Sequence, residues 1–210
     1  IDESALNFNE EATTDDGSCM YPIGGIEFQL NWGLNMVGFT GCEITPIEEA
    51  FQDALGSGSL EETFEIIKDV RGIFWHQELG ENSSLSYLTP GEGYLMYVKP
   101  GQATTVSFSE DYCNDIAYQL NSGWNMVGFT AEEPEDIYTV MNDVLDNGTV
   151  ESTFQIIKNV SGQFWTPWFS LLQGLIPGEA YMMYVIPGQQ TTLSFTDNST
   201  QVFGYNYNSS

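Results

Sequence analysis

A duplicated stretch places the strongest constraint on this chain. Residues 29–40 read QLNWGLNMVGFT and residues 119–130 read QLNSGWNMVGFT, so ten of twelve positions are identical at an offset of 90. TFEIIKDVRGIFW at 63–75 returns as TFQIIKNVSGQFW at 153–165. Residues 90–108 return at 177–195 with fourteen of nineteen identical, now at an offset of 87. We therefore expect two tandem copies of one small domain, with three residues missing from the second copy in the loop after the tryptophan.

This pattern predicts an α+β fold in which each copy is a small, mostly antiparallel β domain carrying one helix. We place an acidic leader at 1–22, repeat domains at 26–112 and 116–196, and a tail at 197–210. Apolar residues spaced i, i+3, i+4, i+7 predict a helix over 46–56 and another over 136–146. Thr45 would cap the first helix and Pro46 would be its first residue. Residues 94–98 and 104–108 are expected to form a closing hairpin across Pro100-Gly101.

Several residues recur in both copies and are expected to serve the fold. The glycine pairs 33/123, 38/128 and 72/162 indicate turns or positive φ. Lys68 and Lys158 are expected to extend along apolar surface or to pair with a carboxylate. Asp69 becomes Asn159, which argues against a catalytic carboxylate there, and Glu92/Glu179 is interpreted as a turn residue within Pro-Gly-Glu.

The chain is strongly acidic, with 4 basic and 30 acidic residues and a net charge of −26. Such a charge repels nucleic acid, whose phosphates must be neutralised by lysine and arginine. Solubility in salty water and specific metal binding are both open explanations. Hydrophobic residues make up 41% of the chain, so it should fold, and no apolar run is long enough for a transmembrane helix. The chain begins at Ile1 without a signal peptide, so we expect any targeting segment to lie upstream or to have been removed.

No catalytic constellation is apparent, and we expect the protein not to be an enzyme. The only histidine, His76, becomes Thr166 in the second copy. There is no phosphate-binding glycine loop followed by lysine, no paired CxxC and no HExxH. Paired carboxylates for glycoside hydrolysis stay open among so many acids.

Aromatic residues cluster near the loop that differs between the copies, and they form a candidate ligand face: Trp75, Trp165, Trp168 and Phe169. Aromatic rings at a loop rim can stack on sugars, so a carbohydrate-binding face near 76–87 and 166–174 is one interpretation. The other is that Trp75 and Trp165 belong to the core and only Trp168 and Phe169 are exposed.

Three cysteines are present, and two of them follow strand ends in the first copy. A disulfide between Cys42 and Cys113 is plausible and would stabilise by roughly 2–4 kcal/mol. That pairing leaves Cys19 for a partner upstream. Five Asn-x-Ser/Thr sequons are possible glycosylation sites, although most are expected by chance in such a chain: Asn82, Asn147, Asn159, Asn198 and Asn208.

The leader crowds short oxygen-bearing side chains around a turn, as a hard cation such as Ca²⁺ requires. Composition alone leaves a metal site and a solvated leader open. The string D-x-x-A-x-N-F-N-x-x-A-T-x-D-D-G-S-C resembles a short cysteine-bounded repeat of surface proteins in marine Bacteroidota and some marine viruses, which is similar to calcium-binding thrombospondin type 3 repeats. The resemblance implies calcium ligands at Asp2, Asn7, Asn9, Asp15 and Asp16. The first cysteine of that repeat would fall before Ile1.

The duplicated unit G-W-N-M-V-G-F-T … I-I-K-x-V-x-G-x-F-W … P-G-E-x-Y-x-M-Y-V resembles a GW-type module of secreted Bacteroidota proteins of the type IX secretion class. The first copy departs from it with Trp-Gly-Leu for Gly-Trp, and the second with Ala180 for the late glycine. The resemblance implies secretion and display at the cell surface. We expect a non-enzymatic structural or adhesive protein, a segment or subunit of an extracellular fibre or filament stabilised by calcium. A carbohydrate-binding module is the alternative.

The tail has no counterpart in either copy. Its stretch VFGYNY at 202–207 alternates apolar or aromatic residues with small or polar ones, as a half-buried strand does. It could join a neighbouring subunit or module as an added strand, return to its own domain, or stay disordered. The partners expected from the sequence are therefore self-assembly or neighbouring modules, with polysaccharide as the alternative, and neither nucleic acid nor membrane insertion.

Overall fold

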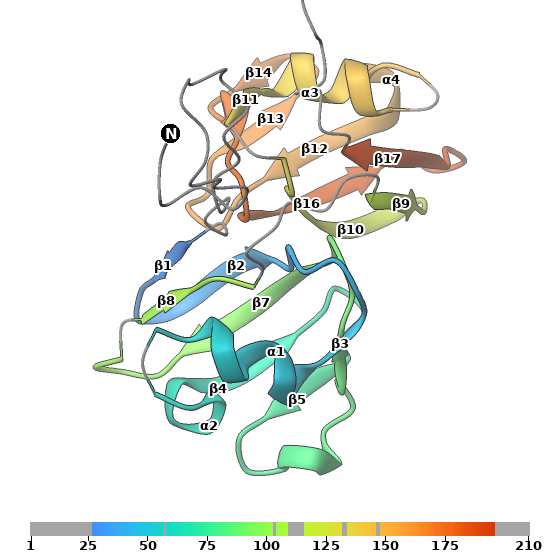
Figure 1. Ribbon diagram of the computed structural model, residues 1–210. Coiled ribbons are helices and arrows are strands. Elements are labelled where there is room, and N and C mark those ends of the chain that lie inside the picture. Colours follow the sequence, from blue (N-terminus) through green and yellow to red (C-terminus); the bar gives the residue numbers. More distant parts are fainter. Residues whose placement is uncertain are drawn as a thin grey trace, which may run out of the picture.

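The computed structural model describes residues 27–56, 58–102, 104–108, 116–131, 134–145 and 148–195. The leader and the tail lie outside these residues. The described part of the chain is built mainly of antiparallel strands with a few short helices (Figure 1). The expected β-rich α+β fold is therefore confirmed.

The first half of the chain, residues 27–108, contains the following elements: β1 (Phe28–Leu30), β2 (Gly33–Gly38), β3 (Thr45–Pro46), α1 (Ile47–Ala54), α2 (Leu60–Thr63), β4 (Phe64–Lys68), β5 (Phe74–His76), β6 (Tyr87–Leu88), β7 (Gly93–Val98) and β8 (Thr104–Val106). A 3₁₀ turn spans Gly80–Asn82. The main sheet has the order β2-β7-β4-β5, while β1 pairs with β8 and β3 with β6.

The second half, residues 116–195, contains β9 (Ile116–Leu120), β10 (Gly123–Gly128), β11 (Glu135–Asp136), α3 (Ile137–Val144), α4 (Val150–Thr153), β12 (Phe154–Lys158), β13 (Phe164–Thr166), β14 (Phe169–Ser170), β15 (Gly174–Leu175), β16 (Ala180–Val185) and β17 (Thr191–Phe195). Its main sheet has the order β10-β16-β12-β13-β14, while β9 pairs with β17 and β11 with β15. The strand β14 extends this sheet by one strand relative to the sheet of the first half.

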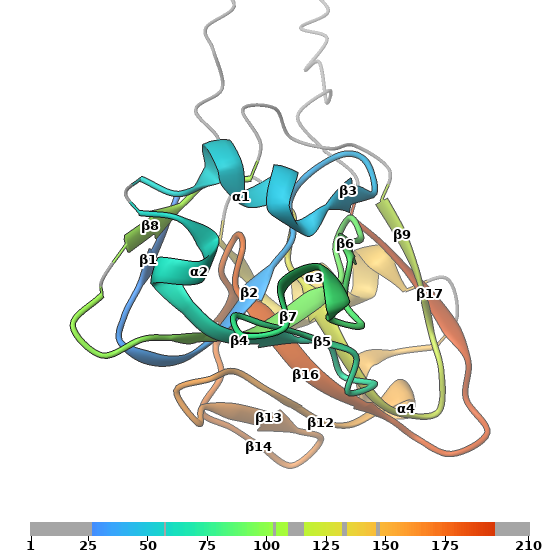
Figure 2. The ribbon, with the colours of Figure 1, turned by 90° about the horizontal axis from the view of Figure 1, so that it is seen from below.

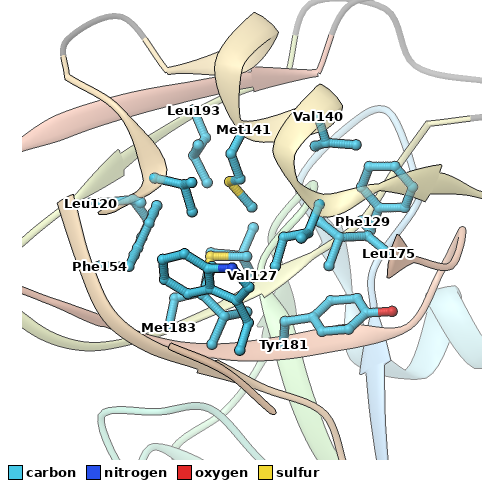
Figure 3. Close-up of a cluster of buried hydrophobic side chains, with 14 of the residues drawn as sticks. Leu120, Val127, Phe129, Val140, Met141, Phe154, Leu175, Tyr181, Met183 and Leu193 are labelled. Atoms are coloured by element: carbon cyan, nitrogen blue, oxygen red, sulfur yellow. The ribbon is translucent and has the colours of Figure 1, made fainter. Parts of the chain in front are cut away.

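Each half has a core between its main sheet and its longer helix. In the first half, Ile47, Phe51 and Ala54 of α1 are buried against the sheet, as the apolar stripe predicts. In the second half, Val140 and Met141 of α3 pack over Phe154, Val127 and Leu193 (Figure 3). Trp75 and Trp165 are among the largest buried side chains, at 1% and 0% exposure.

Three details of the predicted elements are wrong. Pro46 is the N-cap of α1 instead of its first residue, and no side chain caps this helix, because the Thr45 hydroxyl donates to the Glu43 carbonyl instead. Each half has a second short helix, α2 and α4. The helix α2 begins at a capping box in which Ser59 and Glu62 satisfy each other's backbone N–H groups.

The expected closing hairpin is also wrong. Residues 104–106 leave the main sheet after the Pro100-Gly101 turn and pair with β1, with Thr104 opposite Leu30 and Val106 opposite Phe28. The equivalent strand β17 pairs with β9 in the same way. These pairs put the first and last strands of each half side by side, next to its helix.

The two halves meet through β2 and β7 of the first and β10 and β16 of the second (Figure 1). Turned by 90°, β7 and β16 cross one above the other (Figure 2). A small apolar cluster fills the contact between the sheets, made of Met36, Met126 and Ala180 with Leu95 and Met182 at its edge.

The backbone contacts between the halves are reciprocal. Gly38 N donates to Gly178 O at 2.7 Å, and Gly128 N donates to Gly91 O at 2.8 Å. Gly38 and Gly128 themselves touch, since a Cβ built on Gly38 would lie 2.5 Å from the Gly128 Cα. This corrects the expected role of these two glycines, because neither has positive φ and both permit close approach of two strands.

Two aromatic rings, one from each half, pack at the same interface. A Cβ on Gly178 would lie 1.2 Å from Phe28 Cζ, and a Cβ on Gly91 would lie 0.7 Å from the Tyr118 hydroxyl oxygen. Each half therefore inserts a ring from its first strand over the Pro-Gly turn of the other half. Both turn glycines have positive φ, 69° at Gly91 and 74° at Gly178, so glycine is needed there for conformation as well as for space.

Candidate functional site

The predicted calcium ligands Asp2, Asn7, Asn9, Asp15 and Asp16 lie outside the described residues, so calcium binding by the leader stays a prediction. Among the described residues, no three His, Cys, Asp or Glu side chains gather as metal ligands would. None of the helices in the described part is long and apolar enough to cross a membrane.

The predicted disulfide falls partly outside the described residues. Cys42 is exposed just after β2 and is disulfide-bonded. Both of its possible partners, Cys19 and Cys113, lie outside the described ranges. The pairing of Cys42 with Cys113 therefore stays a prediction.

The proposed aromatic face does not exist as a unit. Trp75 and Trp165 are buried in the two cores and cannot stack on a ligand. Trp168 is 88% exposed and Phe169 is 56% exposed, both at the second-half loop. The corresponding first-half loop has Tyr87 as its exposed aromatic residue, so the two loops do not present matching aromatic platforms.

A different aromatic surface lies on the second-half sheet and starts at Trp124 on β10. It is on the face turned away from the core of that half, the same face that meets the first half through Met126 and Met182. The Trp124 ring is 44% exposed and meets the Tyr184 ring edge-on, with centroids 5.2 Å apart. At the opposite margin Phe164 and Phe169 pack with centroids 5.9 Å apart. We call Trp124, Tyr184, Phe164 and Phe169 the aromatic sheet face.

Sequence reasoning missed Trp124, although a signal was available. Strand residues alternate between the faces of a sheet. Val127 is buried in the core, so Trp124, three positions earlier, points to the face turned away from the core. The first half has Leu34 at the corresponding position, 52% exposed opposite Tyr97.

Lys158 belongs to the aromatic sheet face. Its Nζ lies 5.0 Å from the centroid of the Trp124 ring, a distance typical of a cation–π contact. The long side chain thus covers apolar surface, which was one of the two expectations for this residue. Lys68, its counterpart in the first half, is exposed on β4 and faces no tryptophan across the sheet.

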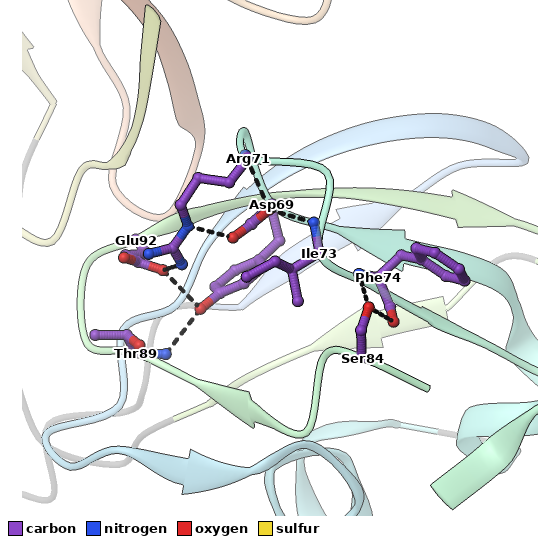
Figure 4. Close-up of polar contacts among 8 residues, drawn as sticks. Asp69, Arg71, Ile73, Phe74, Ser84, Thr89 and Glu92 are labelled. Carbon is purple, nitrogen blue, oxygen red and sulfur yellow. Dashed lines mark hydrogen bonds and ion pairs between the residues drawn. The ribbon is translucent and has the colours of Figure 1, made fainter. Parts of the chain in front are cut away.

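A polar network links two turns of the first half (Figure 4). The buried Asp69 carboxylate accepts hydrogen bonds from the backbone of Arg71 at 2.9 Å and of Ile73 at 2.8 Å. Arg71 Nε lies 2.6 Å from Asp69 Oδ2, and Arg71 Nη2 lies 3.2 Å from Glu92 Oε2. The hydrogen bond that Arg71 donates to Asp69, more than the charge of Glu92, raises the pKa of the Arg71 guanidinium.

The Pro-Gly-Glu turns are each held by a buried tyrosine. The Tyr94 hydroxyl accepts from Thr89 N at 2.8 Å and donates to Glu92 Oε2 at 3.3 Å. In the second half, the Tyr181 hydroxyl accepts from Ile176 N at 2.8 Å and donates to Glu179 Oε2 at 2.9 Å. Burial raises the pKa of both tyrosine hydroxyls above the ordinary range, so both stay protonated as donors.

The remaining candidate residues have structural partners. The His76 ring accepts a hydrogen bond from Glu78 N through Nδ1. Asn159 is buried, and its side-chain nitrogen donates to Gln163 Oε1 at 2.9 Å, so this sequon is closed to glycosylation in the folded chain. Asn82 is exposed at the end of the 3₁₀ turn. The sequons at Asn147, Asn198 and Asn208 lie outside the described residues.

Comparison with known proteins gave no match to any family model, to any curated protein or to any solved structure.

Proposed function

We propose that the two halves are copies of one domain and that together they form a non-enzymatic structural or adhesive unit of an extracellular surface protein. In this proposal the chain is a segment or subunit of a fibre or filament, secreted to the cell surface and stiffened by calcium in its leader. The tail at 197–210 would pair with a neighbouring unit, and the disulfide would fasten the strand ends of the first copy.

The reciprocal interface between the halves is the observation that carries the proposal. Backbone hydrogen bonds at 2.7 and 2.8 Å join the halves, and glycine backbones are in contact at its centre. The Met36, Met126 and Ala180 cluster is buried beside this contact. Flexibly linked domains make polar, loosely packed contacts, whereas backbone contacts of this kind fix the angle between the halves. A fixed angle suits a repeating rigid unit.

The chemistry of the described residues agrees with a non-enzymatic role. The polar network at Asp69, Arg71 and Glu92 holds two turns together. The His76 ring serves as an acceptor for a loop N–H, so it does not activate a nucleophile in this arrangement.

Electron microscopy of the native material tests the proposal, together with a variant that lacks residues 197–210. We expect filaments or oligomers from the full chain and monomers from the shortened chain. The circular dichroism and melting temperature of the two proteins should match, since the core clusters of both halves are built from residues within 27–195. Equal assembly of both proteins, or monomers in both cases, would rule out the proposed linkage.

A carbohydrate-binding module is the second candidate, and the aromatic sheet face favours it. Its rings lie on four of the five strands of the sheet, from Trp124 on β10 to Phe169 on β14, with Lys158 on β12 between them. Four strand spacings of about 4.8 Å give a surface roughly 19 Å wide, enough for several stacked sugar rings. This site replaces the loop site that the sequence suggested.

The first half supplies the variant that tests the carbohydrate hypothesis. Trp124→Leu copies the natural Leu34 and should fold normally. Affinity electrophoresis through gels containing laminarin or hydroxyethylcellulose should show retardation of the wild-type protein and none of Trp124→Leu. If neither polysaccharide retards the wild-type protein, or if the variant is retarded equally, the carbohydrate hypothesis is wrong for these polymers.

A further inference from the structure

A groove of about 340 Å³ lies where the first half meets the second. One wall is formed by β1 and β2, and the other by the turn at Val160-Ser161 and the loop that leads to Glu179. Phe28, Ile176 and Pro177 give it apolar lining, and the acidic residues Glu27 and Glu179 line it too. We call it the acidic groove.

The first half indicates what such a surface binds. Around its own Pro-Gly-Glu turn, the carboxylate of Glu92 receives the guanidinium of Arg71 at 3.2 Å (Figure 4). Arg71 comes from the turn between β4 and β5, and Glu92 directly precedes β7, the strand next to β4. The same carboxylate accepts the Tyr94 hydroxyl at 3.3 Å. A glutamate held by a tyrosine therefore serves here as the receptor for an arginine side chain.

The second half keeps the glutamate–tyrosine pair and lacks both the arginine and the carboxylate of Asp69. Glu179 accepts the Tyr181 hydroxyl at 2.9 Å, as Glu92 accepts Tyr94. Position 161, which corresponds to Arg71, is serine, and its side chain is too short to reach across in the same way. Among the described residues, no lysine or arginine nitrogen lies within 4.0 Å of the Glu179 carboxylate.

The neighbouring turn has adjusted to the loss of the arginine. Asn159 replaces Asp69 and forms its hydrogen bonds with Gln163, through Oδ1 to the backbone nitrogen at 3.0 Å and through Nδ2 to Oε1 at 2.9 Å. The side chain of Asn159 is therefore hydrogen-bonded within its own turn, without a cation. The carboxylate of Glu179 is thus the part of the network left for a partner.

We propose that the acidic groove docks an arginine side chain presented by a peptide segment of a partner protein. The guanidinium would take the place at Glu179 that Arg71 takes at Glu92, and the aliphatic stem would lie on Phe28 and Ile176. Arginine is favoured over lysine because its planar fork can contact a carboxylate with two N–H groups. The net charge of −26 would attract basic partners and speed their approach. The proposal is independent of the filament proposal, since the groove is complete within one chain.

The test uses a probe that copies Val70–Gly72, acetyl-Val-Arg-Gly-amide, and the same peptide with citrulline in place of arginine. Citrulline has nearly the shape of arginine and no charge. In a nuclear magnetic resonance titration of the full chain, the arginine peptide should shift the amide signals of Ser161, Ile176 and Glu179. The citrulline peptide should bind about tenfold more weakly or not measurably.

Three substitutions make the titration specific for the groove. Ser161→Arg supplies the guanidinium from within and should abolish binding, and Glu179→Gln should weaken it about tenfold while keeping the acceptor for Tyr181. Arg71→Ser should open the corresponding place at Glu92 and raise the stoichiometry from one peptide to two. A wild-type melting temperature for Ser161→Arg would show that the loss of binding is not unfolding.

The proposal would be overturned if the citrulline peptide bound as well as the arginine peptide, or if the wild-type chain bound neither. It would also be overturned if binding were unchanged in Ser161→Arg and Glu179→Gln. Finally, it would be overturned if calcium chloride shifted the signals of Ser161, Ile176 and Glu179 and the arginine peptide did not. Shifts spread over the acidic surface with no focus at Glu179 would also overturn it, since they would indicate only a general charge effect.

Discussion

The contact between Gly38 and Gly128 makes a strong prediction for Gly38→Ala. The new Cβ would lie 2.5 Å from the Gly128 Cα, and an ordinary carbon–carbon contact is about 3.5–4.0 Å. The two strands must therefore separate by about 1 Å. Gly38 does not have positive φ, so the cost arises from this contact and not from backbone strain.

The magnitude follows from what the separation disturbs. Overpacking of a well-packed contact costs about 1–3 kcal/mol. The hydrogen bonds from Gly38 N to Gly178 O and from Gly128 N to Gly91 O would lengthen, and each is worth about 1 kcal/mol. We expect a loss of about 2–4 kcal/mol in the free energy of unfolding, a large fraction of the stability of a typical domain.

Urea denaturation monitored by tryptophan fluorescence measures this loss, because Trp75 and Trp165 are buried in different halves. Gly56→Ala is the matched control, since its Cβ would meet Thr105 at an ordinary 3.6 Å. It should leave stability unchanged or raise it by up to about 1 kcal/mol. Gly128→Ala should resemble Gly38→Ala, and the double variant should deviate from additivity by more than about 0.5 kcal/mol, because both changes act at one contact. A loss below about 0.5 kcal/mol in Gly38→Ala would refute the close-packed interface.

The remaining predictions concern the core, the buried tyrosines and the leader. Trp165→Ala should lower the free energy of unfolding, measured in urea, by about 3–5 kcal/mol, because it empties a fully buried site. Trp168→Ala should change that free energy by less than about 0.5 kcal/mol, because Trp168 is exposed. Similar losses in the two variants would contradict the assigned burial. Burial raises the pKa of Tyr94 and Tyr181 above that of an unfolded tyrosine, about 10, so the unfolded chain releases protons first as the pH rises. These two tyrosines should leave the free energy of unfolding unchanged below about pH 10 and lower it as the pH rises further. The decrease with pH should be shallower in Tyr94→Phe and in Tyr181→Phe than in the wild-type protein. Equal slopes in the wild-type protein and both variants would disprove this assignment. Removal of calcium should increase protease cleavage within 1–20 and leave the melting of the two halves unchanged, and a calorimetric trace without any calcium dependence would argue against the leader site.

Local features of the fold could be predicted from the sequence because they depend on residues close together in the chain. The stripe of Ile47, Phe51 and Ala54 indicates α1, and the glycines at 72 and 162 have the positive φ expected of their turns. The capping box of α2 was also visible in the sequence as Ser59 and Glu62, and the helix could have been predicted from it.

Features that depend on distant segments could not be predicted in this way. The pairing of β8 with β1 joins residues 74 or more positions apart, and a hairpin with β7 satisfies the same local pattern. The role of Gly38 depends on Gly128 in the other half, so the recurrence of this glycine looked like a turn requirement. The candidate sites share this limit, since the groove at Glu179 exists only because β1 of the first half lies against a loop of the second.

The differences between the halves are more informative about function than the similarities. Gly38 and Gly128, Trp75 and Trp165, and Tyr94 and Tyr181 keep their roles in both halves, and each of these roles is structural. At two surface sites the halves differ by residues that change chemistry without changing the fold: Leu34 against Trp124 and Arg71 against Ser161.

Both differences expose a potential binding group on the second half, an indole ring at Trp124 and a carboxylate at Glu179. In the first half the corresponding places hold an aliphatic side chain and an internal ion pair. A unit that served only as a spacer would not need such an asymmetry. We therefore expect contacts at these two places to be made by the second half, so exchanging residues 34 and 71 with their counterparts should move this binding from one half to the other.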